Sequence, residues 1–339
     1  MTDDIYQHRA EFSRSQLELL QAEFEGLSEC KKFDNLTIYA TGSFARLEAS
    51  GHSDIDVFFI NVGSEKDVED PKTSSLRMFG KVIEIAERLG FDSFSNDSEY
   101  LRLLHLDEIL SKLGSRIDDH QNYFTARMLL LLESYCIYGK DKFDELVRLI
   151  VASYFRDFKD HQQSFEPRFL MNDLTRFWKT MLLNYENKRR VLAELDSQKG
   201  LTPDIELQRT KQKVRNYKLK YSRMTTCFAT IAALGSHRSP VREEDVIELV
   251  RLTPRERLLS ITTRLPDTTE VVSDLIIKYA GFLQMTGLSM EDLEAQIADK
   301  TRRIELFTAA NEYGDTMFEL LKIIDGADPD LKLLRTVVI

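Results

Sequence analysis

Two aspartates stand one residue apart at the start of a strand-forming run, and their spacing favours metal chemistry. The residues are Asp54 and Asp56, and the run is Ile55–Ile60. Successive side chains of a strand alternate between its two faces, so both carboxylates would point the same way while the apolar side chains between them face the core. Aligned carboxylates repel each other without a cation, and Mg²⁺ prefers hard oxygen ligands together with substrate phosphates. The spacing therefore predicts a magnesium site.

A glycine–serine pair, Gly42 and Ser43, precedes these acids where an earlier strand-like run, Leu36–Ala40, ends. At a strand-to-helix junction such a pair offers backbone N–H groups, a hydroxyl and a helix N-terminus to a phosphate. One loop would then carry a phosphate-binding turn and a metal site. A surface turn before a strand with two exposed acids is the simpler alternative, and a fold that has lost its activity is another.

The elements that must position this loop alternate between helix and strand up to about residue 106. We predict helices over 3–27 and Ser75–Leu89, and strands at Leu36–Ala40, Ile55–Ile60 and Tyr100–Leu106. Helical periodicity then recurs over 122–138, 141–158, 168–195, 207–234, 242–252, 270–287, 289–309 and 312–324. This order predicts a small α/β domain followed by an all-helical domain, with a boundary between 110 and 165.

Composition and charge indicate a folded, helix-rich protein. The 339 residues are 42% hydrophobic and 30% charged, with only 14 Gly and 7 Pro, which excludes a fibrous or disordered chain. The formal net charge is −10, so a polyanion would have to be held by a local basic patch and not by the molecule as a whole. Long apolar runs are absent from the sequence, so we expect no membrane partner and a cytoplasmic location.

The cysteines and histidines argue against a disulfide framework and a zinc site. Cys30, Cys136 and Cys227 show no C-x-x-C spacing, which fits a reducing compartment. The six histidines show no H-E-x-x-H spacing.

One basic run reverses the negative balance locally. Between Arg209 and Arg223 the chain carries seven Lys and Arg residues, two interleaved tyrosines and no acid. At helical pitch these cations spread around the circumference, so a solvated helix is the simpler interpretation of any one of them. Together they could steer a polyanionic acceptor such as RNA.

The pattern Gly42-Ser43, ten residues, Asp54-Ile55-Asp56 resembles the signature of the DNA polymerase β-like nucleotidyltransferases. It is most similar to the nucleotidyltransferase domain of bacterial PII uridylyltransferases and related DUF294-type proteins, with which Arg46, Glu48 and Ser53 also match. The match covers about 15 residues with seven defined positions, so it is more specific than a lone glycine loop. A looser likeness extends over Phe124–Ser134 and Arg168–Arg190.

This resemblance implies an α+β fold: a small mixed-sheet nucleotidyltransferase domain over 1–120, with flanking helices, followed by a helical substrate-binding domain over 121–339. It also implies two Mg²⁺ ions, with Mn²⁺ as a substitute, held by Asp54, Asp56 and a third carboxylate. We choose Asp97 for that position, ahead of Glu99 and Asp92, because a polar turn places it at the mouth of the third strand.

The same resemblance gives roles to other residues. Ser43, in the phosphate-binding turn with Gly42, would bind the β- or γ-phosphate of an NTP, and Ser53 would cap or orient the metal-binding strand. Arg46 would either pair with Glu48 and shape the loop or reach a phosphate. From the helical domain, Lys218 would contact the triphosphate, with Lys220 as second choice.

The implied reaction moves an NMP, with ATP as the preferred donor, onto a hydroxyl acceptor. An RNA or tRNA 3′ end, a protein side chain and a second nucleotide all remain compatible, because metal and triphosphate positioning does not encode the nucleophile. The sequence gives no oligomeric state, and analogy with stand-alone enzymes suggests a toxin or phage-defence role. The alternative is a catalytically silent nucleotide-binding sensor or interaction protein.

Overall fold

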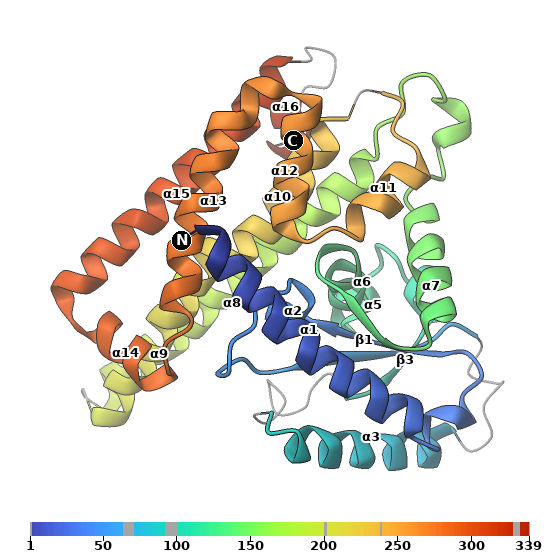
Figure 1. The fold of residues 1–339 in the computed structure, drawn as a ribbon, viewed down its shortest axis with the longest axis horizontal. Coiled ribbons are helices and arrows are strands. Elements are labelled where there is room, and N and C mark those ends of the chain that lie inside the picture. The colour runs from blue at the N-terminus through green and yellow to red at the C-terminus, as the bar shows by residue number, and fades with distance from the viewer. Residues whose placement is uncertain are drawn as a thin grey trace. The chain divides into compact units, whose positions relative to one another are not determined.

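The computed structural model describes residues 2–63, 71–91, 101–199, 202–237, 239–327 and 333–338. The chain divides into two compact units (Figure 1). Unit 1 comprises Asp3–Phe165 and Arg242–Thr253, and unit 2 comprises Glu166–Val241 and Pro254–Ile339. A four-stranded mixed sheet and many helices make this an α+β protein, which confirms the predicted class. None of the helices in the described ranges is long and apolar enough to cross a membrane.

The sheet of unit 1 has the strand order β3-β2-β1-β4. Its strands are β1 (Leu36–Thr41), β2 (Asp56–Asn61), β3 (Leu103–His105) and β4 (Tyr135–Tyr138). Strand β1 is antiparallel to both neighbours, β2 and β4, and β2 is parallel to β3. The β1–β2 register ends with Thr41 opposite Asp56, so the acidic end of β2 lies beside the end of β1.

One face of the sheet forms the main core of unit 1. Helices α1 (Thr2–Gly26) and α3 (Pro71–Arg88) pack their apolar stripes against the alternate residues of β1 and β2 that face this side (Figure 1). On the opposite face, the ring of Tyr39 stacks on that of Phe58, with 5.5 Å between the ring centroids. The Tyr39 hydroxyl donates a hydrogen bond to the Ala126 carbonyl. The sheet is therefore covered on both sides, which buries both faces of β1.

Further helices complete unit 1. They are η1 (Cys30–Lys32), α2 (Gly42–Ala45), α4 (Leu106–Ser111), α5 (Arg116–His120), α6 (Tyr123–Leu132), α7 (Lys140–Ala152), η4 (Phe158–Asp160) and α11 (Glu243–Val250). Helix α11 packs against α7, which returns a late segment of the chain to this unit. The unit extends past residue 120, because α6 and α7 cover β1 and β4 adds an edge strand to the sheet.

The predicted helix over 122–138 is wrong at its end. Helix α6 stops at Leu132, and the aromatic and β-branched run Tyr135–Tyr138 pairs with β1 as strand β4. Gly139 follows with φ 71°, and a Cβ there would overlap the carbonyl oxygen of Leu36. Only glycine fits this close approach of two backbones, so the residue fixes where the strand ends.

Unit 2 is helical throughout its described residues. Its helices are α8 (Arg168–Lys199), α9 (Pro203–Lys218), the π-helical turn η5 (Leu219–Arg223), α10 (Met224–Gly235), α12 (Pro254–Arg264), η6 (Pro266–Thr268), α13 (Thr269–Met285), α14 (Met290–Ala298), α15 (Lys300–Ala327) and α16 (Leu333–Val338). The predicted division into helices over 289–309 and 312–324 is wrong, because the break lies at Asp299 and α15 then runs unbroken to Ala327.

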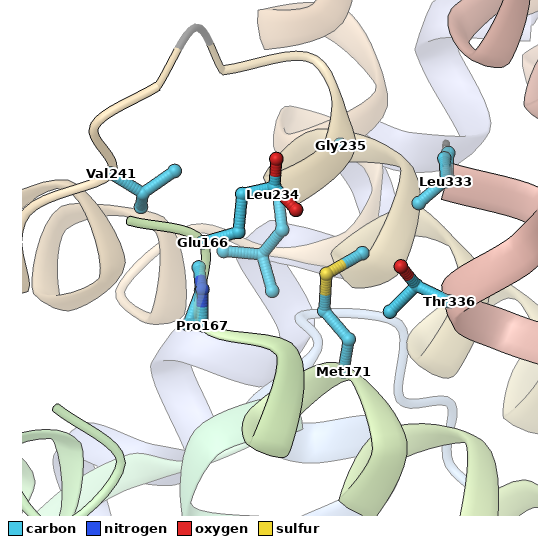
Figure 2. Close-up of a pocket in the computed structure, with 8 residues that line it drawn as sticks. All are labelled: Glu166, Pro167, Met171, Leu234, Gly235, Val241, Leu333 and Thr336. Atoms are coloured by element: carbon cyan, nitrogen blue, oxygen red, sulfur yellow. The ribbon is translucent and has the colours of Figure 1, made fainter. Parts of the chain in front are cut away.

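A small apolar pocket of unit 2 lies where the last helix docks (Figure 2). Leu333 of α16 packs directly over Gly235, since a Cβ on that glycine would come within 2.8 Å of the leucine methyl groups. The backbone N–H of Leu334 donates to the Asp325 carboxylate at 2.9 Å and anchors the start of α16. Among the described residues that line this pocket, only Glu166 and Thr336 have polar side chains, so they offer packing but no catalytic constellation.

Candidate functional site

Asp54 and Asp56 lie on either side of a buried residue at the start of β2. Ile55 is 1% exposed and belongs to the core beneath the sheet, whereas Asp54 is exposed and Asp56 is half-buried. Exposed and buried side chains therefore alternate from Asp54 onward, as predicted, although the strand itself begins at Asp56. Two acidic side chains are thus directed away from the core.

Gly42 follows the residue that pairs with Asp56 and lies beside its side chain. A Cβ built on Gly42 would lie 3.9 Å from Oδ2 of Asp56, which is van der Waals distance. Gly42 has a φ of 73°, in the left-handed region where a side chain is strained, so the turn from β1 into α2 requires glycine. The glycine–serine turn and one of the two acids are therefore neighbours.

Ser43 and the first backbone N–H groups of α2 accompany this contact. Ser43 is half-buried, and the Thr41 side chain makes no capping hydrogen bond to the helix start. The first N–H groups of any helix lack partners within the helix itself. The turn therefore presents a hydroxyl and backbone donors beside a carboxylate.

Ser53 closes the turn that leads into the acids. Its hydroxyl accepts a hydrogen bond from the Ser50 backbone N–H at 3.0 Å, and its own N–H donates to the Ser50 carbonyl at 3.0 Å. This reciprocal pair fixes the backbone immediately before Asp54. The role predicted for Ser53 at the metal-binding strand stays a prediction.

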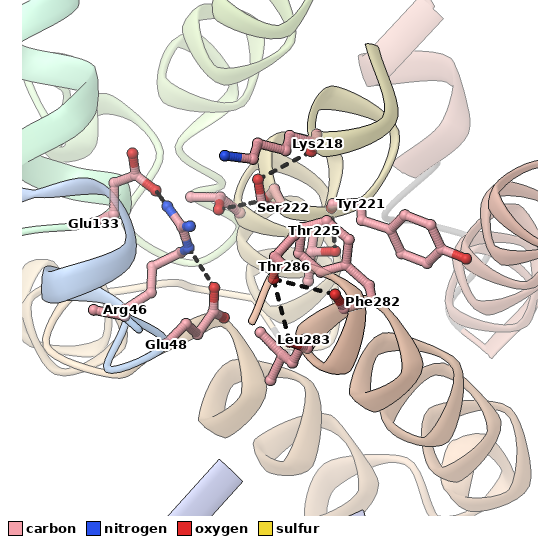
Figure 3. Close-up of polar contacts among 12 residues, drawn as sticks. Arg46, Glu48, Glu133, Lys218, Tyr221, Ser222, Thr225, Phe282, Leu283 and Thr286 are labelled. Atoms are coloured by element: carbon pink, nitrogen blue, oxygen red, sulfur yellow. Dashed lines mark hydrogen bonds and ion pairs between the residues drawn. The ribbon is translucent and has the colours of Figure 1, made fainter. Parts of the chain in front are cut away.

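Arg46 forms a buried ion-pair network with two glutamates (Figure 3). Its Nε donates to Oε2 of Glu48 at 2.7 Å, and its Nη1 donates to Oε2 of Glu133 at 2.5 Å. All three side chains are at most 7% exposed. Of the two roles open to Arg46, the pair with Glu48 is present. Buried charges of this kind persist only when they are paired and hydrogen-bonded.

Helix α1 is hydrogen-bonded to the same loop between β1 and β2. The Ser13 hydroxyl accepts from the backbone N–H of Ala49 at 3.0 Å and donates to the Arg9 carbonyl at 2.7 Å. The buried Arg9 side chain has a pKa below its ordinary value because of desolvation, and the attraction of Glu48 partly offsets that effect. The loop between β1 and β2 is thus held from the helix that covers the sheet.

Leu47 adds backbone strain at this point. Its φ of 59° is left-handed, which non-glycine residues rarely adopt, and its N–H donates to the Phe44 carbonyl at 3.0 Å. Two of the three charged residues of the network, Arg46 and Glu48, flank it in sequence. Strain held in place by paired neighbours is common at sites that need a fixed loop geometry.

The three candidates for a third carboxylate, Asp92, Asp97 and Glu99, lie outside the described residues. Among the described residues, in this loop as in the rest of the chain, no group of three or more His, Cys, Asp or Glu side chains could hold a metal ion. The donors at hand are two carboxylates and a serine hydroxyl, all hard oxygen ligands. That set fits Mg²⁺, which commonly takes one or two carboxylates and completes its shell with phosphates and water.

Lys218 lies in unit 2, at the end of α9, so its contact with the triphosphate stays a prediction. A π-helical turn follows it, and two hydroxyl groups bind main-chain carbonyls there (Figure 3). Ser222 donates to the Lys218 carbonyl at 3.0 Å, and Thr225 donates to the Tyr221 carbonyl at 2.6 Å. Both bonds run from a hydroxyl to the carbonyl four residues earlier, a bond that Ser and Thr commonly make in helices. The second choice, Lys220, donates to Asn311 of α15.

A second buried ion pair was not predicted from the sequence. Arg127 donates two hydrogen bonds to Asp118, at 3.0 and 2.9 Å, and a third to the Tyr154 hydroxyl at 2.8 Å. Burial by itself lowers the pKa of Arg127, but the Asp118 carboxylate and Tyr154 outweigh it and raise that pKa overall. Both charged side chains are fully buried, so this pair holds α5 to α6 and is not open to a ligand.

Comparisons of the chain with protein-family models, with curated proteins and with solved structures find no match. The case for a function therefore rests on the residues and geometry described above.

Proposed function

We propose that the chain is a Mg²⁺-dependent nucleotidyltransferase that moves an NMP from an NTP, preferentially ATP, onto a hydroxyl acceptor. The observation that carries the proposal is that Gly42 lies beside the Asp56 carboxylate, close enough for an added Cβ to touch it. It brings a turn with phosphate-binding character next to an acid that can hold a cation. The seven-position motif resembling polymerase β-like nucleotidyltransferases supports the same assignment.

Each residue of the loop has one task in this proposal. Asp54 and Asp56 hold the metal, with Asp97 as the proposed third carboxylate. Ser43 and the backbone N–H groups of the Gly42–Ser43 turn bind the β- or γ-phosphate. When bound, two Mg²⁺ ions supply Lewis acidity that favours in-line attack of the acceptor hydroxyl on the α-phosphorus and departure of pyrophosphate.

Arg46 and Glu48 act on the shape of the loop in this scheme. The Arg46 guanidinium is 7% exposed and binds two carboxylates, which leaves it poorly placed to contact a phosphate. Its interaction with Glu133 connects the loop to the residue after α6. We therefore assign the network to positioning the turn against Asp56, and the phosphate to Ser43.

The experiment is a nucleotidyl-transfer assay with each α-labelled NTP, Mg²⁺ and cell extract, read as labelled product and as pyrophosphate release. We expect Asp54→Asn and Asp56→Asn each to reduce transfer to background. Asp34→Asn is the matched control, because Asp34 is an exposed aspartate before the other end of β1. Transfer that persists in the Asp54→Asn/Asp56→Asn variant would reject the mechanism.

ATP binding without pyrophosphate release, with every acceptor tested, would instead favour the alternative function, a silent nucleotide-binding sensor. Titration calorimetry with ATP and Mg²⁺ checks the binding that both functions predict, and pyrophosphate release separates them, because only the enzyme predicts turnover.

A further inference from the structure

Helix α3 carries two large apolar side chains on its outer side, away from the sheet. Its inner side, including Met78, Val82 and Ile85, is buried in the core of unit 1. On the outer side, Leu76 is 63% exposed and Ile83 is 36% exposed. Single exposed apolar residues are common on proteins, but these two are part of a symmetrical arrangement.

The arrangement is centred on Gly80. Residues three and four positions apart are neighbours on the surface of a helix. Leu76 and Ile83, four positions before and three after Gly80, therefore lie on one side of it. Arg77 and Glu84, three positions before and four after, lie on its other side. We call these five residues the α3 outer surface.

Nothing in the described part of the chain requires a glycine at position 80. Gly80 is exposed in the middle of α3, and a Cβ built on it meets no described atom within 4 Å. Glycine in an exposed helix interior makes the helix less stable than alanine would. The missing side chain does allow the backbone of a second helix to approach closely.

The charged residues of the α3 outer surface are available to a partner. Arg77 is exposed, and it forms no ion pair with any described residue. Glu84 pairs with Lys81 of the same helix, and both side chains are exposed. Exposed pairs of this kind contribute little, so Glu84 can bind a second cation.

A two-fold axis at Gly80 matches both sides of the α3 outer surface to themselves. When two α3 helices lie antiparallel across this axis, Leu76 of each copy lies beside Ile83 of the other. The same rotation places Arg77 of each copy beside Glu84 of the other. The charges and the apolar side chains are therefore complementary to those of a second copy, whereas a different protein would need a matching pattern of its own.

The ends of α3 also favour an antiparallel second copy. The first turn holds Lys72 and no acid, and the last turn holds Glu87, so both of these charges oppose the helix dipole. The base of the last turn, Arg88, is paired with Glu23 of α1. In an antiparallel pair each end of a helix lies beside the opposite end of the other, which brings Lys72 of each copy near Glu87 of the other.

We propose that the chain forms a homodimer in which the α3 outer surfaces of two copies pack antiparallel and cross at Gly80. A contact between two single helices is at the small end of specific interfaces, about 1,000 Å², so we expect a weak dimer with a dissociation constant on the order of 10 µM. The dimer is independent of the proposed reaction, because α3 carries none of the residues assigned to that reaction.

Sedimentation equilibrium of the full chain, from about 1 to about 200 µM, measures the dissociation constant. A wild-type chain that stays monomeric over this range overturns the proposal. Gly80→Leu should raise the dissociation constant at least about tenfold, because two leucines would occupy the point where the helices cross. Leucine favours helix more than glycine does, so the melting temperature of this variant should not fall.

Gly281→Leu is the matched control. Gly281 is exposed in the middle of α13, and a Cβ built on it also meets no described atom within 4 Å. The control should leave the dissociation constant unchanged. An equal effect of the two substitutions, or a dimer unaffected by Gly80→Leu, overturns the proposal.

Exchange of charge tests the antiparallel geometry. Arg77→Glu gives the α3 outer surface two acids and Glu84→Arg gives it two bases, so each variant alone should dimerise roughly tenfold more weakly than the wild type. An equimolar mixture of the two variants restores both contacts between opposite charges and should form a heterodimer about as tight as the wild-type dimer. Single variants as tight as the wild type, or a mixture no tighter than its components, overturn the proposal.

Discussion

The guanidinium of Arg46 is held by Glu133, a residue 87 positions further along the chain. The interaction links the loop between β1 and β2 to the segment between α6 and β4, and neither partner is accessible to solvent to any large extent. Because Glu48 binds the same guanidinium, the loop that carries the candidate site is fixed at its centre by one buried cation and two carboxylates.

Glu133→Gln should lower the free energy of unfolding by about 3 kcal/mol, because removing one charge of a buried pair leaves the other incompletely compensated. Urea denaturation measures the change. The exposed pair Arg189–Glu186 provides the control, and Arg189→Ala should leave stability unchanged within error. A Glu133→Gln protein as stable as the wild type would show that Glu48 alone suffices for Arg46.

Gly42→Ala should reduce nucleotidyl transfer far more than it reduces stability. Alanine at a φ of 73° costs about 1–2 kcal/mol, and relief of that strain would move the turn away from Asp56. Gly114→Ala is the matched control: Gly114 has a φ of 77° and nothing lies within 4 Å of a Cβ built on it. We expect an equal loss of stability and full activity in that control. Equal activity losses in both variants would contradict a specific role for Gly42.

Patterns that are local in sequence were predictable, and contacts between distant segments were not. Strands β1 and β2 and helices α1 and α3 follow from apolar periodicity within each segment. Strand β4 could not be predicted in this way. Its four residues come shortly after an apolar helix and form a strand only by pairing with β1. Helix α12 was missed because its sequence is mostly polar and one of its buried residues is Arg257.

The residues of the candidate site also fall into those that a local motif indicated and those that it did not. Gly42, Asp54 and Asp56 were identified because the motif lies in one short loop, whose strand–turn–strand geometry brings the glycine to Asp56. Glu133 was missed because nothing near it in sequence indicates a partner 87 residues away. The available signal was Glu133 itself, a charged residue directly after the apolar run Met128–Leu132, since buried charges require partners.

The pair formed by Asp118 and Arg127 should prove sensitive to geometry as well as charge. Arg127→Lys keeps the charge but loses the two-pronged contact, and we expect it to lower the free energy of unfolding by about 2–3 kcal/mol. Tyr154→Phe removes one hydrogen bond to the same guanidinium and should cost about 1 kcal/mol. Chemical denaturation of the two variants and their combination measures the coupling. A lysine variant of wild-type stability would show that charge alone is required.

The three thiols should react slowly, and in a fixed order, in the native protein at pH 8. Burial raises the pKa of Cys30 and Cys227 to about 12 and that of Cys136 to about 11. The thiolate is the reactive form, so iodoacetamide should modify Cys136 first and the other two only after unfolding. Peptide mass spectrometry with time gives the order. Modification of Cys30 or Cys227 before Cys136 would contradict it.

The same pKa shifts predict how stability depends on alkaline pH. The folded state keeps these thiols protonated, so their contribution to stability is fully present below pH 9, the ordinary pKa of a thiol, and is lost as the pH rises toward about 12. Urea midpoints measured from pH 8 to 11 should therefore fall. Cys227→Ala, which removes one fully buried thiol, should make that fall shallower; an unchanged pH dependence would mean that other groups cause it.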